Sequence, residues 1–540
     1  MGRNFVTAER DQLFLLPPDA RQWLPERHLA WAVLEQAGRM DLGLFTGWYR
    51  ADGQGRPAYH PQLMVSLVMY CYCKGIRSSR AIEMATFDDL GARVICGNLH
   101  PDHSTIARFV TRHEQPVKGL LVASLTACAR EGLVSVDVVA GDGTKVKASA
   151  SMAANATAEQ LEIGIGELEA LLAAEVDAWL AQARAADAAE DALFSDGGDG
   201  PGAGGGPGTL ARLTDKIVRR SKAAARLEAE EQGRQQQAQA EREAKITAAR
   251  QRVARAERRV AREEAAAAAK VADYQARATV KAASGSRKGP DGRTPVAPGD
   301  SAHVRQARQA AGQARQRLAA AAAAPACAPA PARPPKANIT DPASRVMPAK
   351  KGGFDQMYNV QVIAARHQVI TAIATHDNPA DTGALHPLLE QGAANLAAAG
   401  IAVVIEKALF DAGYASEDNF TAGCGAELYV AVTRESRQAG RLRDGKAPPA
   451  AQPGWQAMAA RLDTPEGHAL YKQRKAIIEP VFAQLFARFG RTLHYRGDMV
   501  TTEIHLWAAV HNTLKAIRAR TRREQRERQA AARQPAPAAA

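Results

Sequence analysis

Residues 400–420, GIAVVIEKALFDAGYASEDNF, join an apolar run to a carboxylate and a turn. The run at 401–410 is rich in valine and isoleucine, which favours a buried β-strand. Asp411 follows the run directly, and Gly413 and Tyr414 supply a turn. An aspartate close to a glycine is most often only a turn residue. This stretch therefore predicts a strand that ends at Asp411, and a functional role would require further carboxylates in the same setting.

A second stretch, LVSVDVVAGDGTKVKASAS (133–151), has the same organisation. Its valines predict a strand over residues 133–140 that delivers Asp142 between two glycines. In an open α/β sheet, ligands bind beyond the carboxyl ends of the strands, where both aspartates would then lie. Two carboxylates at such an edge repel each other unless a cation lies between them. Oxygen ligands without histidine or cysteine favour Mg²⁺ or Mn²⁺, so the two aspartates predict a site for such ions.

A third acid is expected on a helix packed beside those strand ends. The sequence YKQRKAIIEPVFAQLFARFG (471–490) has helical spacing and places Glu479 on one face with Tyr471 and Lys475. Pro480 follows at once and would either open a new helical segment or kink the helix. A surface or salt-bridged glutamate is the alternative interpretation of Glu479. Two rival acids occur in the loop-like sequence before this helix, Asp463 and Glu466.

The order of the expected elements indicates the fold class. Without one long insertion, that order is strand, strands, helix, strand, strand and helices, which is typical of an α/β fold. Four regions are predicted: a helical N-terminal domain at 1–130, a catalytic domain at 131–152 and 338–517, a helical insertion at 153–337, and a basic disordered tail at 518–540. The N-terminal helices would bind DNA or serve only as structure, since their pattern fits both. Residues 434–468 read as a loop.

The insertion differs from the rest of the chain in composition, because alanine, arginine, glutamate and glutamine dominate it. A glycine-rich break at 196–208 precedes a long helical pattern, and a Pro/Ala linker at 325–336 closes the insertion. A three-four apolar spacing in the long helix predicts a coiled-coil seam, formed by Ile246, Ala249, Val253, Ala256 and Val260. The seam is weak because alanine is small. We therefore expect a helical hairpin with flexible joints, outside the catalytic core.

Composition restricts the class of partner. The 540 residues carry a net charge of +13, which favours a polyanion, with nucleic acid first and an anionic membrane surface second. No stretch approaches about 18 uninterrupted apolar residues, so no membrane-spanning helix is expected. The N-terminus lacks the apolar segment of a secretory signal, and the six scattered cysteines lack the usual zinc spacing. A cytoplasmic, nucleoid-associated protein with reduced thiols is the expectation.

Eight motifs, taken in order, give the sequence a family resemblance. The N-terminal motifs are LLPPDARQWLPERHLAWAVLEQ (15–36), YHPQLMVSLVMYCYCKGIRSSRAIE (59–83) and PDHSTIARFVTRH (101–113). The later motifs are GDGTKVKASAS (141–151), ITDPASRVMPAKKGGFDQMYNVQ (339–361), THDNPADTGALHPLLE (375–390), LFDAGYASEDNF (409–420) and IIEPVFAQLFARFGRTLHYRG (477–497). Together they resemble the DDE transposases of bacterial insertion sequences, in the IS-four/IS-five superfamily and its IS-eleven-eighty-two group.

The resemblance implies an RNase H-like catalytic domain with a mostly helical N-terminal domain. It implies that Asp142, Asp411 and Glu479 form the catalytic DDE triad. The three acids would hold Mg²⁺ or Mn²⁺, as a pair of ions that serves phosphoryl transfer.

The resemblance also implies a set of DNA-binding residues. Tyr471 and Arg474 resemble the tyrosine and arginine that precede the glutamate in the superfamily, although Arg474 lies five positions before it rather than four. The basic residue usual seven positions after the glutamate is Phe486 here, and Arg488 is the nearest substitute. Lys475 would neutralise phosphate charge beside Arg474.

Two lysines follow the first aspartate with strand spacing, Lys145 and Lys147. They would line the DNA track or remain solvated strand charges. The arginine-rich stretch from 515 to 533 would add salt-dependent DNA affinity or serve only solubility.

The implied activity is that of a transposase, which cuts double-stranded DNA at the terminal inverted repeats of a mobile element and joins the freed 3′-OH to target DNA. A homodimer is expected, since two element ends must be held together, and no membrane is involved. Two alternatives stay open: an RNase H-like nuclease that cuts without strand transfer, and an inactive DNA-binding scaffold built on the coiled coil. The scaffold does not require the three acids to converge.

Overall fold

The computed structural model divides the chain into two compact units. Unit 1 comprises Met1–Asn155 and Asn338–Ala540, and unit 2 comprises Ala156–Ala337. The structure describes residues 22–49, 58–193, 207–284, 290, 293–325, 327–328, 331, 333–349, 352–376, 378–402, 404–432 and 452–533. Most of the glycine-rich break, residues 196–206, and much of the loop expected at 434–468 lie outside these residues.

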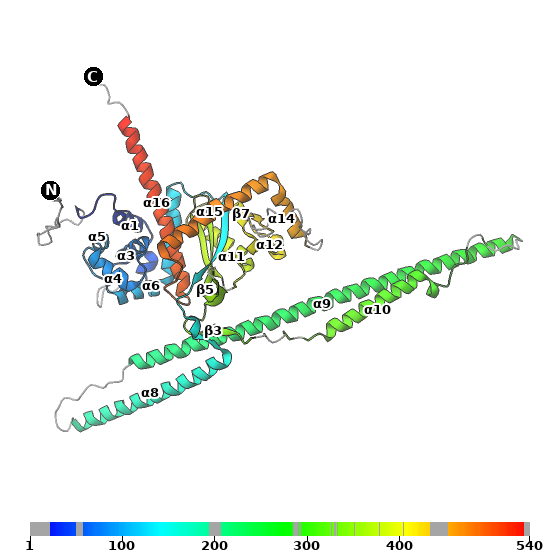
Figure 1. Cartoon of the computed structure of the whole chain (residues 1–540), viewed down its shortest axis with the longest axis horizontal. Helices are drawn as coiled ribbons and strands as arrows, with labels where there is room; N and C mark the ends of the chain where they lie inside the picture. The colour runs from blue at the N-terminus through cyan, green and yellow to red at the C-terminus, as the bar shows by residue number, and fades with distance from the viewer. Residues whose placement is uncertain are drawn as a thin grey trace, which may run out of the picture. The chain divides into compact units, whose positions relative to one another are not determined.

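Unit 1 is built on a mixed sheet of six strands (Figure 1). In chain order the strands are β1 (Val138–Lys147), β4 (Arg345–Pro348), β5 (Phe354–Ala365), β6 (Ile370–His376), β7 (Lys407–Phe410) and β8 (Glu427–Val430). The sheet order is β4-β5-β1-β7-β8, and β6 also pairs with β5. β5 pairs antiparallel with β1, β4 and β6, whereas β1–β7 and β7–β8 are parallel. This mixed sheet, with helices around it, confirms the α/β class.

The strand lengths correct two expectations. The strand expected at 133–140 begins instead at Val138 and continues through Lys147, because β5 pairs with it from Val139 as far as Lys147. Asp142 therefore lies inside β1 rather than after its end. The strand expected at 401–410 is only β7, Lys407–Phe410, and Asp411 still follows it directly. Two further strands, β5 and β6, occupy residues 354–376.

The two faces of the sheet carry separate hydrophobic clusters, as the two-residue period of a strand requires. On one face, Val138, Ala140 and Val362 belong to a large cluster with residues of α15 (Pro465–Phe489) and α16 (Met499–Arg533). On the other face, Val139 and Ile363 pack with residues of α11 (Leu385–Ala398). The alternation assigns each residue of β1 to one of these two sides.

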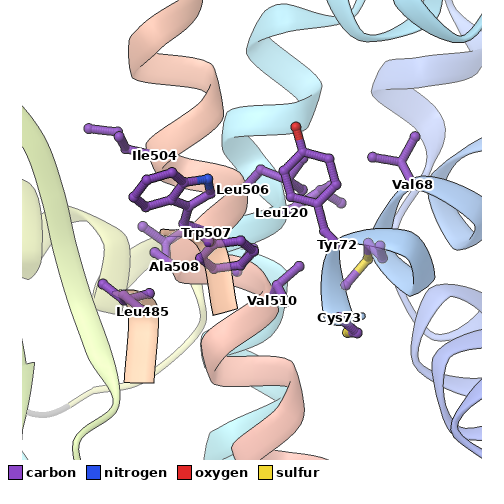
Figure 2. Packing of buried hydrophobic residues seen from close by; sticks show 14 of the residues in the cluster. Val68, Tyr72, Cys73, Leu120, Leu485, Ile504, Leu506, Trp507, Ala508 and Val510 are labelled. Atoms are coloured by element: carbon purple, nitrogen blue, oxygen red, sulfur yellow. The ribbon is translucent and has the colours of Figure 1, made fainter. Parts of the chain in front are cut away.

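The N-terminal helices share the large cluster with the sheet. They are α1 (Leu29–Gly38), α2 (Gly43–Thr46), α3 (Pro61–Cys73), α4 (Ser79–Asp88), α5 (Leu90–Cys96), α6 (His103–Arg112) and α7 (Glu114–Arg130). Figure 2 shows Tyr72 of α3 and Leu120 of α7 near Trp507 of α16, and all three belong to that cluster. The helical region and the sheet thus belong to one compact unit.

Trp507 is central to this cluster, with 1% of its surface exposed. Its ring stacks on Phe489 with centroids 4.9 Å apart, and the Arg77 guanidinium lies 5.5 Å from its centroid. Trp507→Ala is expected to lower the free energy of unfolding by about 3–5 kcal/mol, measured by urea denaturation. Trp507→Phe should cost less, because the buried indole N–H has no hydrogen-bond partner among the described residues. A loss below about 1 kcal/mol for Trp507→Ala would contradict this packing.

Helices replace the end of the loop that the sequence predicted at 434–468. α14 (Pro453–Asp463) and α15 both begin with proline in the first helical turn, where its missing N–H costs nothing. Thr464 caps α15, since its Oγ1 accepts a hydrogen bond from the Gly467 N–H at 3.0 Å. The prolines there are helix starts, which the sequence analysis took for loop residues.

Residues 518–533 of the expected disordered tail are helical, because α16 continues to Arg533. The cysteines at 71, 73, 96 and 128 are buried and unoxidised, as expected of core thiols, whereas Cys327 is exposed. None of the helices in the described ranges is long and apolar enough to span a bilayer.

Unit 2 consists mainly of three helices, α8 (Ala158–Leu193), α9 (Pro207–Ala283) and α10 (Ala302–Ala323). Short strands β2 (Asn155–Thr157) and β3 (Lys336–Asn338) pair at its two ends. α9 and α10 run antiparallel, because Arg308 pairs with Glu264 while Arg315 pairs with Glu257, each at 2.6 Å. Of the expected seam on α9, Ala249 is buried and the other four residues are half-buried. α8 precedes the glycine-rich break and adds a third helix to the hairpin expected from the sequence.

Candidate active site

Asp142 and Asp411 occupy matching positions on adjacent parallel strands. The last register pair of β1 and β7 is Ala140 with Leu409, and each aspartate follows its strand's member of that pair by two residues. A two-residue step returns a side chain to the same face of the sheet. Ala140 and Leu409 lie in the cluster that includes α15 and α16, so both aspartates belong to the face that α15 covers.

The pKa of Asp142 shows that the two carboxylates interact electrostatically. Burial, and after it the charge of Asp411, raise the pKa of Asp142 to about 6. Arg474 and the Gly143 N–H, which donates to Asp142 Oδ1 at 2.8 Å, act in the opposite direction. A half-buried carboxyl facing a second carboxylate is stabilised in its ionised form by a cation. The donors are oxygens, so the pair fits Mg²⁺ or Mn²⁺.

Arg474 reaches this pair from α15. Its Nη1 lies 3.4 Å from Asp142 Oδ2, and the arginine side chain is 5% exposed. A buried guanidinium is permanently charged, and here it offsets part of the negative charge on the aspartates. Arg474 therefore lies beside the first aspartate.

Asp411 is held by the turn that follows it. Its Oδ1 accepts a hydrogen bond from the Gly413 N–H at 3.0 Å, at the start of the short helix η5 (Ala412–Tyr414). A Cβ at Gly413 would lie 3.0 Å from Asp411 Oδ1 and 3.0 Å from Asp381 Oδ2, so a larger residue would press on both acids. Tyr414 is buried, and its hydroxyl donates to the side-chain carbonyl of Gln361. The turn expected at Gly413 and Tyr414 thus fixes the second aspartate.

Asp381 is a fourth acid that the sequence analysis missed. Its Oδ1 accepts hydrogen bonds from Asn359 Nδ2 and Gln361 Nε2, both at 2.7 Å. A Cβ at Gly143 would lie 2.8 Å from the same oxygen, which places Asp381 against the residue that follows Asp142. Asp381 precedes α11 and lies five residues after the end of β6, too far from it for strand-end reasoning to indicate it. Its occurrence within the THDNPADTGALHPLLE motif was the only available clue.

The two lysines on β1 make ion pairs within the protein. Lys145 Nζ donates to the Pro379 carbonyl at 2.7 Å and lies 3.5 Å from Asp381 Oδ1. Lys147 Nζ lies 2.5 Å from Asp355 Oδ2. Lys145 also interacts with the charge of Asp411, so it lies at the aspartate site. Lys147 lies two residues further along the strand.

Pro480 lies within α15, so the helix neither stops nor restarts there. A proline cannot donate to the carbonyl four residues earlier, here Ala476. Gln368 Nε2 donates to that carbonyl at 3.3 Å and takes the place of the missing bond.

Glu479 is exposed on α15, five residues after the buried Arg474. Its helix packs on the face that carries both aspartates. Among the described residues, no group of three or more His, Cys, Asp or Glu side chains is close enough to hold a metal ion, so Glu479 is not gathered with the aspartates. The rival acids, Asp463 and Glu466, lie at the end of α14 and in the first turn of α15.

The remaining expected DNA-binding residues lie along α15. Tyr471 is half-buried and Lys475 is exposed, both within one turn of Arg474. Arg488 lies near the other end of the helix, where its Nη1 donates to the Cys73 carbonyl. The Arg491 guanidinium lies 4.0 Å from the ring centroid of Phe486, the position at which the family pattern has a basic residue.

Two family profiles match the chain. Residues 331–513 match the profile described as Transposase DDE domain, and residues 18–112 match the Transposase domain (DUF772). The chain belongs to the DDE transposases. It is therefore a DDE-type transposase enzyme, and the matches do not decide its insertion-sequence group. No curated protein and no solved structure matches the chain.

The two matches cover some of the acids of the site of this transposase but not all of them. The DDE match includes Asp381, Asp411 and Glu479. It begins at residue 331, in the last part of unit 2, so Asp142 on β1 precedes it. The N-terminal match extends from before α1 to the end of α6. Most of unit 2 lies between the two matched segments, and its last residues, 331–337, fall within the DDE match.

Proposed function

We propose that this transposase binds the ends of a mobile element and catalyses Mg²⁺-dependent cleavage and strand transfer at a site formed by Asp142, Asp411 and Glu479. The observation that carries the proposal is the pairing of the two aspartates on adjacent strands, where each charge disfavours the other. A cation of high charge density relieves that repulsion. Arg474 beside Asp142 adds a fixed positive charge next to the reacting phosphate.

Asp142 and Asp411 would hold the metal ions, with Glu479 as the third acid. When bound, two such ions activate the attacking oxygen and stabilise the leaving 3′ oxygen of an in-line displacement. The Gly413 N–H keeps Asp411 oriented, while Arg474 restrains Asp142 from α15. The 3′-OH released by cleavage then attacks a target phosphodiester, so no residue of the chain becomes covalently linked to DNA.

The catalytic domain is proposed to be RNase H-like. Three antiparallel strands in the order β6-β5-β1, continued by parallel β7 and β8 beyond β1, support this assignment. The antiparallel pairing and ion pairs of α9 and α10 support a coiled coil in the insertion. A homodimer that holds two element ends, and a cytoplasmic, nucleoid-associated location, follow from a substrate of chromosomal DNA.

Asp381 is proposed to be a positioning residue of this site, because it joins Lys145 to the two polar side chains of β5 and borders Gly143 and Gly413. Asp381→Asn is expected to lower the cleavage rate about 10- to 100-fold, the usual effect of losing an outer-shell partner. The Mg²⁺ concentration at half-maximal rate should rise, and Asp381→Glu should recover part of the loss. Glu390→Gln, an exposed position on α11, is the matched control. An Asp381→Asn enzyme with unchanged rate and Mg²⁺ dependence would refute the role.

The test of the function is cleavage and joining on the terminal repeats that flank the gene, with and without Mg²⁺. The proposal predicts nicked ends and joined target products only when Mg²⁺ or Mn²⁺ is present. Cleavage without joined products would instead indicate the nuclease alternative. End binding without either reaction, under all divalent ions tried, would indicate the scaffold.

A further inference from the structure

Two adjoining cavities lie between the C-terminal half of α15 and α16. The first has a volume of about 370 Å³ and the second about 340 Å³. They share three lining residues, so they form one groove, and these are Gln484, Lys515 and Arg518. Lys74, at the end of α3, lines one end of the groove. The turn between β5 and β6 lines the other end.

Four cations line this groove without a carboxylate to pair with: Arg488, Lys515, Arg518 and Arg522. None of them forms an ion pair with an acid in the part of the chain that the structure describes. Arg488 donates to the Cys73 carbonyl, and Lys515 Nζ donates to Gln368 Oε1 at 3.0 Å. Both acceptors are neutral, so the positive charge of the groove is not compensated.

Each of these cations also makes the charged form of its neighbours less favourable. Burial lowers the pKa of Lys515, and the charges of Arg518 and Arg522 lower it further. Burial likewise lowers the pKa of Arg488, with Arg518 acting in the same direction. Such crowding is unfavourable in the free protein and is relieved by an anionic ligand.

The arginines on another side of α16 differ in this respect. Arg520 pairs with Glu35 and with Glu524, and Arg523 lies 2.9 Å from Glu131 Oε2. The groove residues follow one another at three- and four-residue steps, which keeps them on one side of the helix. The basic residues on one side of α16 therefore form ion pairs with glutamates (the compensated side), whereas those that line the groove do not, within the described ranges. The sequence alone shows only a single arginine-rich tail.

We infer that this groove binds the phosphodiester backbone of double-stranded DNA, at a place separate from the aspartates. Arg488 lies fourteen residues after Arg474 on α15, a distance of about 21 Å at about 1.5 Å per residue. That length corresponds to about six base pairs of duplex. The seven helical steps from Lys515 to Arg522 cover about 10 Å of helix, enough for successive phosphates of one strand. The inference rests on the proposed function, because it assigns a contact to the same DNA substrate.

The test compares two double variants of the full-length protein that remove the same charge from the same helix. Arg518→Gln with Arg522→Gln changes the groove, and Arg520→Gln with Arg523→Gln changes the compensated side. Affinity for a terminal-repeat duplex is measured by fluorescence anisotropy over a series of salt concentrations. Each lost phosphate contact should reduce the slope of log affinity against log salt by about 0.9, so the groove variant should lose about 1.8. The control variant should keep the wild-type slope, and circular dichroism checks that both are folded.

Equal slopes for the two variants would overturn the inference while leaving the proposed function intact, provided that the wild type still cleaves the repeats. A wild type that binds no duplex would overturn both. A further arm adds inorganic phosphate at constant ionic strength. Inorganic phosphate should displace the duplex more readily from the wild type than from the groove variant, because it competes for the same cations. Equal displacement from both proteins would reject a backbone contact in the groove.

Discussion

Asp411→Asn is expected to abolish Mg²⁺-dependent cleavage of the element ends while leaving the affinity for those ends unchanged. Asparagine keeps the size of the side chain and its carbonyl can still accept from the Gly413 N–H, so the turn should persist. It removes the negative charge that faces Asp142 and that a divalent ion would neutralise. A metal site supplies several kcal/mol of transition-state stabilisation, so a loss of about 4 kcal/mol would slow cleavage about a thousandfold.

The matched control for this variant is Asp418→Asn, an exposed aspartate seven residues further along, whose activity should stay at the wild-type level. Binding of both variants to the terminal-repeat duplex is measured beside single-turnover cleavage. Cleavage by Asp411→Asn within tenfold of the wild-type rate would remove Asp411 from the site. Loss of binding together with cleavage would point to a folding defect rather than to chemistry.

Glu479→Gln is expected to have an effect of similar size, about a thousandfold on cleavage with unchanged end binding. The reason is that two aspartates leave a divalent ion short of protein ligands, and Glu479 lies on the helix that packs over their face of the sheet. Its side chain is exposed, so it is free to be drawn toward a bound ion. The measurement is single-turnover cleavage across a range of Mg²⁺ concentrations.

Two acids serve as controls, since the sequence offers them as rivals. Asp463→Asn and Glu466→Gln should each cleave at the wild-type rate if Glu479 is the third acid. A thousandfold loss in either rival, with normal cleavage by Glu479→Gln, would move the third ligand to the start of α15. Pro480→Ala should be tolerated in the fold, because an alanine restores the helical N–H that Pro480 lacks.

The sequence pattern predicted the pair of aspartates, but it placed the end of the first strand too early, before Asp142. The apolar runs before the two aspartates indicated two strands, and the structure has β1 and β7 at their ends. The glycines around Asp142 suggested that the strand stops there, although β1 continues because β5 pairs along its whole length. Pairing between strands that lie more than 200 residues apart in the chain has no local signal. What does end near Asp142 is the parallel partner β7.

Asp381 shows a second limit of local patterns. Its place at the site depends on two amides of β5, a lysine of β1 and two glycines that make room for it. These residues come from three separate segments, and none of them marks the aspartate by spacing. The basic groove has the same origin, since α3, α15, α16 and the β5–β6 turn contribute to it. Sequence patterns located the strands and helices, whereas the sites depend on how those elements meet.

The measurement that tests the central claim most directly is cleavage of the protein backbone by Fe²⁺ bound in place of Mg²⁺, with ascorbate and peroxide in the presence of the DNA end. Hydroxyl radicals made at the ion cut the chain next to its ligands. The account predicts cuts near Asp142, Asp411 and Glu479, suppressed by excess Mg²⁺ and absent in Asp411→Asn. Cuts at only one of these segments, or cuts near Asp463 and Glu466 in place of Glu479, would contradict it.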